Sequence, residues 1–304
     1  MIPDEKQKFR RGVFLAISAY TMAGFAPVYF KLVAGIPVVE MLSHRIIWSF
    51  FLIALLLHCN RRWKMVQRIV TSKVNMLYLL CSTLSIGMNW LIYIWAIKSG
   101  QVLEASLGYY INPLINVLLG MILLGENLRR LQWIAVILAV CGVMVQLIAF
   151  GSVPFVAIAL AFSFSFYGLI RKKANIDSQV GLFIETLLML PAAMVYLFWV
   201  ADTPTAHFFN NPLILNLLLM SVGVVTAVPL MCFAGAATRL KFATLGFFQY
   251  ICPSLIFLLA VLLYGEAFTL DKAITFAFIW IALIIFSFDG INYNKQSGKP
   301  VEQK

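Results

Sequence analysis

The stretch Ala105-Ser-Leu-Gly-Tyr-Tyr-Ile-Asn-Pro113, followed later by Leu124-Gly-Glu126, decides the fold of this chain because it occurs twice. The second copy reads Ala243-Thr-Leu-Gly-Phe-Phe-Gln-Tyr-Ile-Cys-Pro253, followed by Tyr264-Gly-Glu266. The glycine lies twelve positions after the proline in both copies. The two prolines lie 140 residues apart, whereas the leading alanines lie 138 residues apart. The chain is therefore a duplicated unit whose copies differ by a two-residue insertion or deletion.

The composition places this duplicated unit in a membrane. Hydrophobic residues make up 62% and charged residues 12% of the 304 residues, and the mean hydropathy is +0.93. Soluble domains are about 25% charged, so we expect an integral membrane protein surrounded by a lipid bilayer. The basic residues before position 12 precede an apolar run of full span length without a small-residue cleavage site. We expect a retained first helix there rather than a cleaved leader.

Ten apolar runs are long enough to cross the bilayer, because about 17 to 25 helical residues span a hydrocarbon layer of about 30 Å. They form two sets of five. The first set lies at residues 12–33, 37–58, 75–97, 102–124 and 131–149. The second set lies at residues 153–170, 179–200, 213–236, 242–264 and 273–290. The sequence therefore predicts an all-α polytopic membrane protein with ten transmembrane helices.

The basic residues indicate how these spans are oriented. If the N-terminus is cytoplasmic, nineteen of the 23 lysines and arginines fall in cytoplasmic segments, Lys31, Lys98 and Lys272 fall outside, and Arg45 lies within a span. This bias predicts that both termini are cytoplasmic. The net charge of +11 is then a topology signal, and no nucleic-acid partner is expected. A lipid-binding patch remains an alternative interpretation of the basic segment 61–73.

An odd number of spans in each unit makes the duplication inverted, since the second unit enters the membrane from the opposite side. Two inverted halves that exchange inward-open and outward-open states are characteristic of secondary transporters. We expect four regions, which are a cytoplasmic tail at 1–11, a first five-helix repeat at 12–149, a second at 150–290 and a cytoplasmic tail at 291–304.

Three longer segments carry a family resemblance. They are Leu42-Ser-His-Arg-Ile-Ile-Trp-Ser-Phe50, Glu104-Ala-Ser-Leu-Gly-Tyr109 and Leu245-Gly-Phe-Phe-Gln-Tyr-Ile251. Together with the duplicated Pro-x11-Gly-Glu pattern they resemble the EamA-type permeases of the drug/metabolite transporter superfamily. The resemblance implies a permease of the cell inner membrane that exports small metabolites or drugs. It also implies that helices one to four of each half surround a central cavity, while the fifth and tenth helices pack peripherally.

Polar residues at helical spacing mark the faces that we expect to line this cavity. On the fourth span Glu104, Gly108, Asn112 and Asn116 follow one another at intervals of four residues, which places them on one face. The ninth span carries a corresponding stripe that ends at Pro253. Paired interruptions of transporter helices point to a transport site, and we expect helix breaks at the prolines, namely Pro27, Pro113 and Pro253.

Aromatic and amide side chains supply the expected lining, which suits small, partly apolar molecules that are neutral or zwitterionic. The third span adds an amide and two aromatic residues, and the second span adds an arginine and a tryptophan. The predicted substrate-binding residues are Arg45, Trp48, Asn89, Trp90, Tyr93, Tyr109, Asn112, Gln249 and Tyr250. The alternative is that these small and amide residues only join helices to one another.

Two ionisable residues lie deeper in the predicted spans than the others. Arg45 lies about eight residues into the second span from outside, and Glu185 about seven into the seventh span from inside, so they occupy equivalent positions in the inverted halves. We expect Arg45 to hold an anionic substrate group or to gate, Glu185 to carry a coupling proton or a substrate cation, and Glu104 to take part in gating. The alternative is a static buried charge network with Glu104, Glu40 or His44.

The remaining reactive residues indicate structural roles. The five cysteines lack CxxC spacing, so no metal site and no disulfide framework is expected. Glu126 and Glu266 follow glycine at helix ends, where a carboxylate can cap the free N–H groups of a following helix. Nucleotide-binding motifs are absent from the sequence, so we expect no cofactor and a transport process driven by gradients.

Three alternatives to a proton-coupled carrier remain. One is a facilitator or exchanger without proton coupling. The second is an intramembrane enzyme, although neither HExxH nor GxSxG occurs and the histidines are scattered; we expect no enzyme. The third is a sensor or scaffold without flux, against which stands the lack of a long hydrophilic segment. The protein is expected to be a monomer, or a homodimer through the fifth and tenth helices.

Overall fold

The computed structural model describes residues 3–203, 205, 211–265 and 269–296, and these contain helices and connections but no strand. Ten of the described helices are long and apolar enough to cross a membrane, so the predicted all-α polytopic fold is confirmed. The first half contains α1 (Pro3–Leu32), α2 (Val38–Cys59), α3 (Trp63–Val70), α4 (Lys73–Lys98), α5 (Val102–Leu124) and α6 (Arg130–Phe150).

The second half repeats the spanning helices of this set, with its fourth span divided in two and without a described counterpart of α3. Its elements are α7 (Phe155–Ala174), α8 (Ser178–Val195) continued by the π-helical turn η1 (Tyr196–Val200), α9 (Leu213–Ala237), α10 (Phe242–Gln249), α11 (Ile251–Leu262) and α12 (Leu270–Gln296). α1 begins within the predicted N-terminal tail and α12 continues beyond the predicted last span. Polar ends of this kind stay helical because a helix satisfies its own backbone hydrogen bonds outside the hydrocarbon as well as within it.

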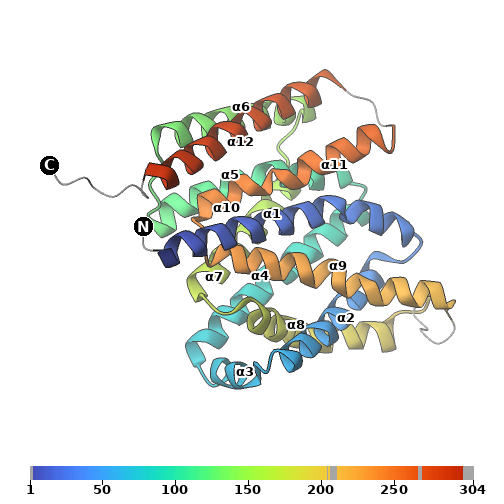
Figure 1. Cartoon of the computed structure of the whole chain (residues 1–304). Coiled ribbons are helices and arrows are strands. Elements are labelled where there is room, and N and C mark those ends of the chain that lie inside the picture. Colours follow the sequence, from blue (N-terminus) through green and yellow to red (C-terminus); the bar gives the residue numbers. More distant parts are fainter. Residues whose placement is uncertain (1–2, 204, 206–210, 266–268, 297–304) are drawn as a thin grey trace.

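The start of α1 and the last turns of α12 lie at the same end of the bundle (Figure 1). We call this the terminal end, and we call the opposite end, where α1 runs into α2, the distal end. The short helix α3 lies at the edge of the bundle near the start of α4. Trp63 packs edge-on against Phe183 at 5.3 Å between ring centroids, and Val66 is buried. Lys64 and Arg68 remain exposed, so α3 is amphipathic.

The contacts between the spanning helices come in matched pairs. α7 packs against α4 and α5, and α1 packs in the same way against α9 and α11. Likewise α2 contacts α9 while α8 contacts α4, and the pairs α2–α8, α5–α10 and α6–α12 join equivalent helices of the two halves. Exchanging each helix for its counterpart in the other half therefore returns most of these contacts, except that the contacts of α7 and α8 with α9 have no counterpart of similar extent between α1 or α2 and α4.

Glycines allow the closest of these approaches. A β-carbon placed on Gly223 of α9 would lie 2.5 Å from the backbone carbon of Trp48 on α2. One placed on Gly246 of α10 would lie 2.8 Å from the carbonyl oxygen of Pro113 on α5. Small residues are favoured at such positions because membrane helices gain stability from van der Waals packing when their backbones approach closely.

α6 and α12 pack together at one edge of the bundle (Figure 1). Thr275 donates a hydrogen bond to the carbonyl of Gly142 at 3.2 Å and accepts one from Gln146 at 3.0 Å. An ion pair between Arg129 and Asp289 joins the same helices at the terminal end. The described residues of these two helices do not line the central cavity, as the peripheral packing of the fifth and tenth spans requires.

The prediction of helix breaks was wrong for two of the three prolines. α1 runs through Pro27 and α5 runs through Pro113 without interruption. A proline removes one backbone hydrogen bond, and neighbouring helices and side chains can satisfy the freed carbonyl inside a membrane bundle. The ninth span does divide, at Tyr250, three residues before Pro253.

Candidate substrate cavity

A cavity of about 610 Å³ lies between the two halves of the bundle. Its walls come from α1, α2, α4 and α5 of the first half and from α7, α9, α10 and α11 of the second. This volume lies within the range of about 300 to 1,000 Å³ that holds small organic ligands. The lining is mostly apolar, with a few polar groups placed among aromatic rings.

The cavity reaches the distal end of the bundle and stops short of the terminal end. Along α1 its lining begins at Ala19 and continues to Lys31, and it extends to Ala34 and Ile36 in the connection to α2. Lys31 and Ala34 are exposed. The side chain of Lys31 lies over the ring of Tyr264, 4.0 Å from its centroid. The pocket is thus accessible from one end of the bundle.

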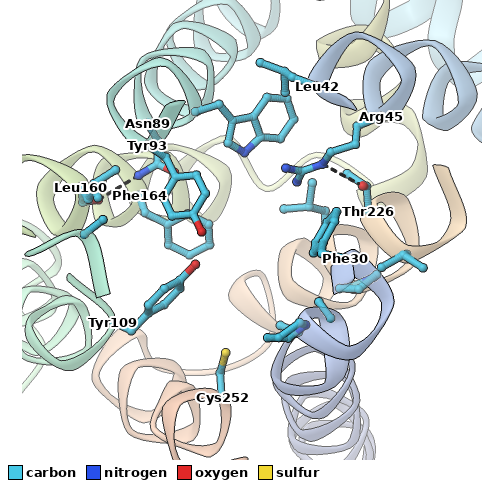
Figure 2. A pocket seen from close by; sticks show the side chains of 18 of the residues that line it. Phe30, Leu42, Arg45, Asn89, Tyr93, Tyr109, Leu160, Phe164, Thr226 and Cys252 are labelled. Atoms are coloured by element: carbon cyan, nitrogen blue, oxygen red, sulfur yellow. Dashed lines mark hydrogen bonds between the residues drawn. The ribbon is translucent and has the colours of Figure 1, made fainter. Parts of the chain in front are cut away.

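Arg45 supplies a positive charge deep in the cavity wall. Its Nε donates a hydrogen bond to the hydroxyl of Thr226 on α9 at 3.0 Å, and the guanidinium points into the cavity (Figure 2). The guanidinium carbon lies 5.0 Å from the centroid of the Trp90 ring and 5.7 Å from that of Phe30. Cation–π contacts of this kind stabilise a charge that has left water.

A pair of tyrosines stands on the wall across the cavity from Arg45. The hydroxyl groups of Tyr93 on α4 and Tyr109 on α5 both line the cavity and point toward one another (Figure 2). Beside them, the amide of Asn89 donates to the carbonyl of Leu160 at 3.0 Å and to the hydroxyl of Ser163 at 2.9 Å. Asn89 therefore both lines the cavity and joins α4 to α7.

A chain of amides continues the polar wall toward the interior. Asn112 donates to the carbonyl of Ala161 at 2.7 Å, and Asn116 donates to Asn112 at 3.4 Å and to Gln249 at 2.8 Å. Asn112 and Gln249 line the cavity, whereas Asn116 is buried behind them. The stripe predicted on the fourth span therefore serves partly as a lining and partly as a link between the halves.

Seven of the nine predicted substrate-binding residues border the cavity, and the prediction was wrong for Trp48 and Tyr250. Trp48 packs with Met41 and Leu219 where α2 meets α9. Tyr250 is fully buried against Phe247, and its hydroxyl donates to the carbonyl of Tyr110 at 3.3 Å. Trp48 was predicted as part of the aromatic lining and Tyr250 as part of the polar stripe on the ninth span, but both lie about one-sixth to one-third of a turn away from the residues that face the cavity.

Glu104 also lies outside the cavity lining. Its carboxylate accepts a hydrogen bond from the backbone N–H of Val156 at 2.7 Å, at the first turn of α7. A carboxylate at a helix N-terminus satisfies a free N–H group and interacts favourably with the helix dipole. Glu104 is thus a capping residue in this structure rather than part of a buried charge network with Arg45.

Several lining residues were not among those predicted, namely Tyr20, Phe30, Phe164, Thr226, Phe233 and Cys252. Tyr20 is buried, and its hydroxyl has no hydrogen-bond partner among the described residues. The signal for Tyr20 was available, since it precedes Gly24 and Pro27 at helical spacing on the first span. Thr226 and Cys252 sit among apolar residues and could not have been singled out without the packing of α9 and α11.

Glu185 belongs to a separate buried cluster at the terminal end. Its carboxylate lies 3.5 Å from the Arg171 guanidinium and accepts hydrogen bonds from Ser82 at 2.6 Å and Tyr167 at 3.3 Å. Arg171 and Glu185 each expose 1% of their surface. A β-carbon on Gly181 would lie only 1.7 Å from the guanidinium. Glycine at this position therefore makes room for the ion pair between α7 and α8.

A second cluster closes the terminal end between α5, α7 and α10. Glu126 accepts hydrogen bonds from the backbone N–H groups of Phe242 at 2.6 Å and Ala243 at 2.9 Å. Lys172 lies 3.8 Å from the same carboxylate and donates to the carbonyls of Ala237 and Leu240. The capping role predicted for Glu126 is confirmed, although the capped helix is α10 of the other half. Glu266 lies outside the described residues.

Ten membrane-spanning helices around a pocket that opens at one end define the chain as a multi-pass membrane protein built to hold a small molecule. Comparison with known proteins agrees with this class. The family model described as the EamA-like transporter family matches residues 10–148. An uncharacterized transporter of Vibrio cholerae is 62% identical over 96% of this chain and 96% of that protein.

Proteins named RarD are similar over nearly the whole chain. Protein RarD of Escherichia coli K12 is 54% identical over 97% of this chain and 100% of that protein. A chloramphenicol-sensitive protein RarD of Pseudomonas aeruginosa is 32% identical over 92% and 94%. A protein crystal structure covers 90% of this chain with a TM-score of 0.71 and 16% identity, and so shares the fold. The chain belongs to the EamA-like transporter family, in which it is a RarD-like membrane permease.

Proposed function

We propose that the chain is a secondary transporter of the cell inner membrane that exports small organic metabolites or drugs by alternating access. The observation that carries this proposal is the central cavity, which reaches the distal end while two polar clusters close the terminal end. A carrier needs such a pocket between two gates. In this interpretation the distal end faces the periplasm, and both termini are cytoplasmic, as the distribution of basic residues favours.

The matched helix contacts support two inverted repeats at 12–149 and 150–290 as the moving units. α7 and α8 contact α9, whereas α1 and α2 make no contact of similar extent with α4. We infer that these roles of the halves are reversed in the inward-open state. Glu185 occupies in the second half the position that Arg45 occupies in the first. We infer that Glu185 comes to face the cavity when the terminal end opens. The cavity is complete within one chain, so a monomer suffices for transport.

This exchange of roles gives Glu185 a place in proton coupling. In the outward-open state its charge is balanced by Arg171 at 3.5 Å and by hydrogen bonds from Ser82 and Tyr167. Opening the terminal end separates these helices, and an unbalanced carboxylate in a low-dielectric environment is costly. Protonation of Glu185 removes that cost, so a proton taken up by Glu185 favours the inward-open state.

The same ion pair supports a second candidate, which is exchange without proton coupling. Arg171 already neutralises Glu185 in place, so the pair can remain intact and move with α7 and α8 as one unit. In that case the cycle needs only substrate, and flux follows the solute gradients. The two candidates differ in whether a pH gradient drives accumulation.

Transport by purified protein in liposomes tests both candidates. The liposomes would be offered pooled labelled amino acids, nucleobases and chloramphenicol, with and without an imposed pH gradient. Chloramphenicol is included because one relative is named a chloramphenicol-sensitive protein. Gradient-dependent accumulation that is lost in Glu185→Gln supports proton coupling. Equal flux without a gradient response supports exchange. Ala26→Trp, which fills the cavity, should abolish flux, whereas Ile17→Trp on the same helix, exposed and outside the lining, should not. The absence of saturable flux for every one of these compounds and for an aromatic carboxylate would contradict the transport proposal.

A further inference from the structure

We propose that the preferred substrates are small organic monoanions, with one carboxylate or comparable acid group on an apolar, ring-bearing body and no ammonium group. This inference rests on the proposed function of the same cavity, and it names the chemical class that the cavity selects. It is carried by the geometry of Arg45, by the sign of the charges in the described lining and by the apolar walls around them.

Arg45 presents an anion-binding group that is already oriented. Within the described residues its Nε–Thr226 contact at 3.0 Å is its one hydrogen bond, and no carboxylate forms a salt bridge with it. The two terminal nitrogens therefore retain their donors for a ligand. A planar guanidinium fork matches the two oxygens of a carboxylate in a bidentate arrangement. Trp90 and Phe30 hold the guanidinium carbon at 5.0 and 5.7 Å from their ring centroids, which restricts its orientation.

The charges along the described lining favour an anion and disfavour other ions. Arg45 and Lys31 are cations, and no aspartate or glutamate of the described part of the chain borders the cavity. A cationic substrate would meet only like charge. The ammonium group of a zwitterion would have to leave water without a counter-ion, which costs free energy unless it is paired. A neutral molecule would leave Arg45 without an anionic partner.

The walls beyond Arg45 fit the rest of such a molecule. Phe164, Phe233 and Leu160 also line the cavity, whose volume is about 610 Å³. Burial of an apolar body there removes hydrocarbon surface from water, which contributes about 25 cal/mol per Å². The hydroxyl of Tyr20, without a partner among the described residues, leaves one hydrogen-bond donor free at the inner part of α1.

A matched series of compounds tests the charge preference. The probes are 3-phenylpropanoate, its neutral amide, 3-phenylpropylamine and the zwitterion phenylalanine, which share one body and differ in charge. Binding to the purified full-length protein would be followed by the change in tryptophan fluorescence, since Trp90 lies beside Arg45, and checked by calorimetry. We expect the carboxylate to bind about tenfold or more tighter than the other three.

Variants of Arg45 separate the ligand contact from an effect on folding. Arg45→Gln should weaken carboxylate binding about tenfold or more and leave binding of the amide unchanged, while Arg45→Lys should retain part of the preference because it keeps the charge and loses the fork. Arg68→Gln, which removes an exposed charge on α3, is the matched control and should bind like the original protein. If Arg45→Gln does not fold, Arg45→Lys and the compound series still test the inference.

The outcomes also distinguish this inference from the proposed function. Equal or tighter binding of the amide, the amine or the zwitterion overturns the anion preference, as does the absence of binding by every compound. Saturable transport of a neutral or zwitterionic compound that Ala26→Trp abolishes would overturn the preference while retaining the transporter. Tight carboxylate binding without flux in liposomes would retain the site and contradict transport.

Discussion

The carboxylate of Glu126, at the end of α5, accepts a hydrogen bond from the backbone N–H of Phe242 at 2.6 Å, 116 residues further along the chain. The first four N–H groups of a helix have no partner within the helix. A residue of the first half therefore completes the first turn of a helix of the second half. This contact closes the terminal end of the cavity and joins the two halves at the same point.

Removing this cap should loosen the terminal end. Glu126→Ala is expected to lower the free energy of unfolding by about 1.5 to 3 kcal/mol, the usual contribution of hydrogen bonds to a charged group. Glu126→Gln keeps one acceptor oxygen, so its free energy of unfolding should lie between those of the original protein and Glu126→Ala. Hydrogen exchange of the Phe242 and Ala243 amides measures the effect directly. Unchanged protection of these two amides in Glu126→Ala would contradict the capping role.

A single methyl group at position 181 should disrupt the buried ion pair. In Gly181→Ala the new β-carbon would lie 1.7 Å from the Arg171 guanidinium, so Arg171 must move away from Glu185. Loss of a buried ion-pair partner costs about 3 to 5 kcal/mol, and thermal unfolding in detergent should show a correspondingly lower Tm. Gly87→Ala is the control, because its β-carbon would meet only the end of Met189 at 3.6 Å. Similar Tm values for both variants would be inconsistent with this packing.

The Arg171–Glu185 pair should show strong coupling in a double-mutant cycle. Arg171→Met leaves Glu185 buried without a counter-charge and should be destabilised by about 3 to 5 kcal/mol. Adding Glu185→Gln to Arg171→Met removes the unbalanced charge and should restore most of the lost stability. Chemical denaturation of the four proteins of the cycle measures the coupling. Additive effects of the two substitutions would mean that the residues do not interact.

The hydroxyl of Thr226 should set the orientation of Arg45. Thr226→Val keeps the shape of the side chain and removes the acceptor for the Arg45 Nε. Transport should then show a KM higher by roughly tenfold, which corresponds to about 1.4 kcal/mol for one hydrogen bond to a charged group. Thr83→Val is the control, since the hydroxyl of Thr83 donates to the carbonyl of Leu79 on its own helix and lies outside the cavity lining. An equal rise of KM in both variants would argue against the positioning role.

The sequence predicted the spans well because hydropathy and span length are local properties. All ten predicted spans coincide with helices, and the end of α5 at Leu124 agrees to the residue. The helix α3 was not predicted, because its basic residues were interpreted as a topology signal and its apolar side is only two turns long. Most of the polar lining residues were also predictable, since polar residues in hydrocarbon must face a cavity or another helix, whereas the apolar part of the lining was not.

The contacts that a side chain makes with other helices were much harder to predict than its position along its own helix. Glu185 lies inside the helix predicted for it, but its partner is Arg171, near the end of α7, a residue that the distribution of basic residues assigned to a cytoplasmic segment. Trp48 was placed in the cavity as an aromatic lining residue, and Tyr250 as a member of the polar stripe on the ninth span. Their actual environment depends on how α2 and α10 are rotated, which is decided by close approaches such as that of Gly223 to Trp48.

In the proposed alternating-access cycle, the cap that Glu126 places on α10 makes water a participant in each conformational change. When the terminal end opens, the N–H groups of Phe242 and Ala243 lose their carboxylate and must be hydrated, together with Glu126 itself. We therefore expect each opening to bring water into the bundle at these groups and each closing to expel it. A neutral osmolyte that lowers the water activity on that side will slow turnover even when substrate and gradients are unchanged.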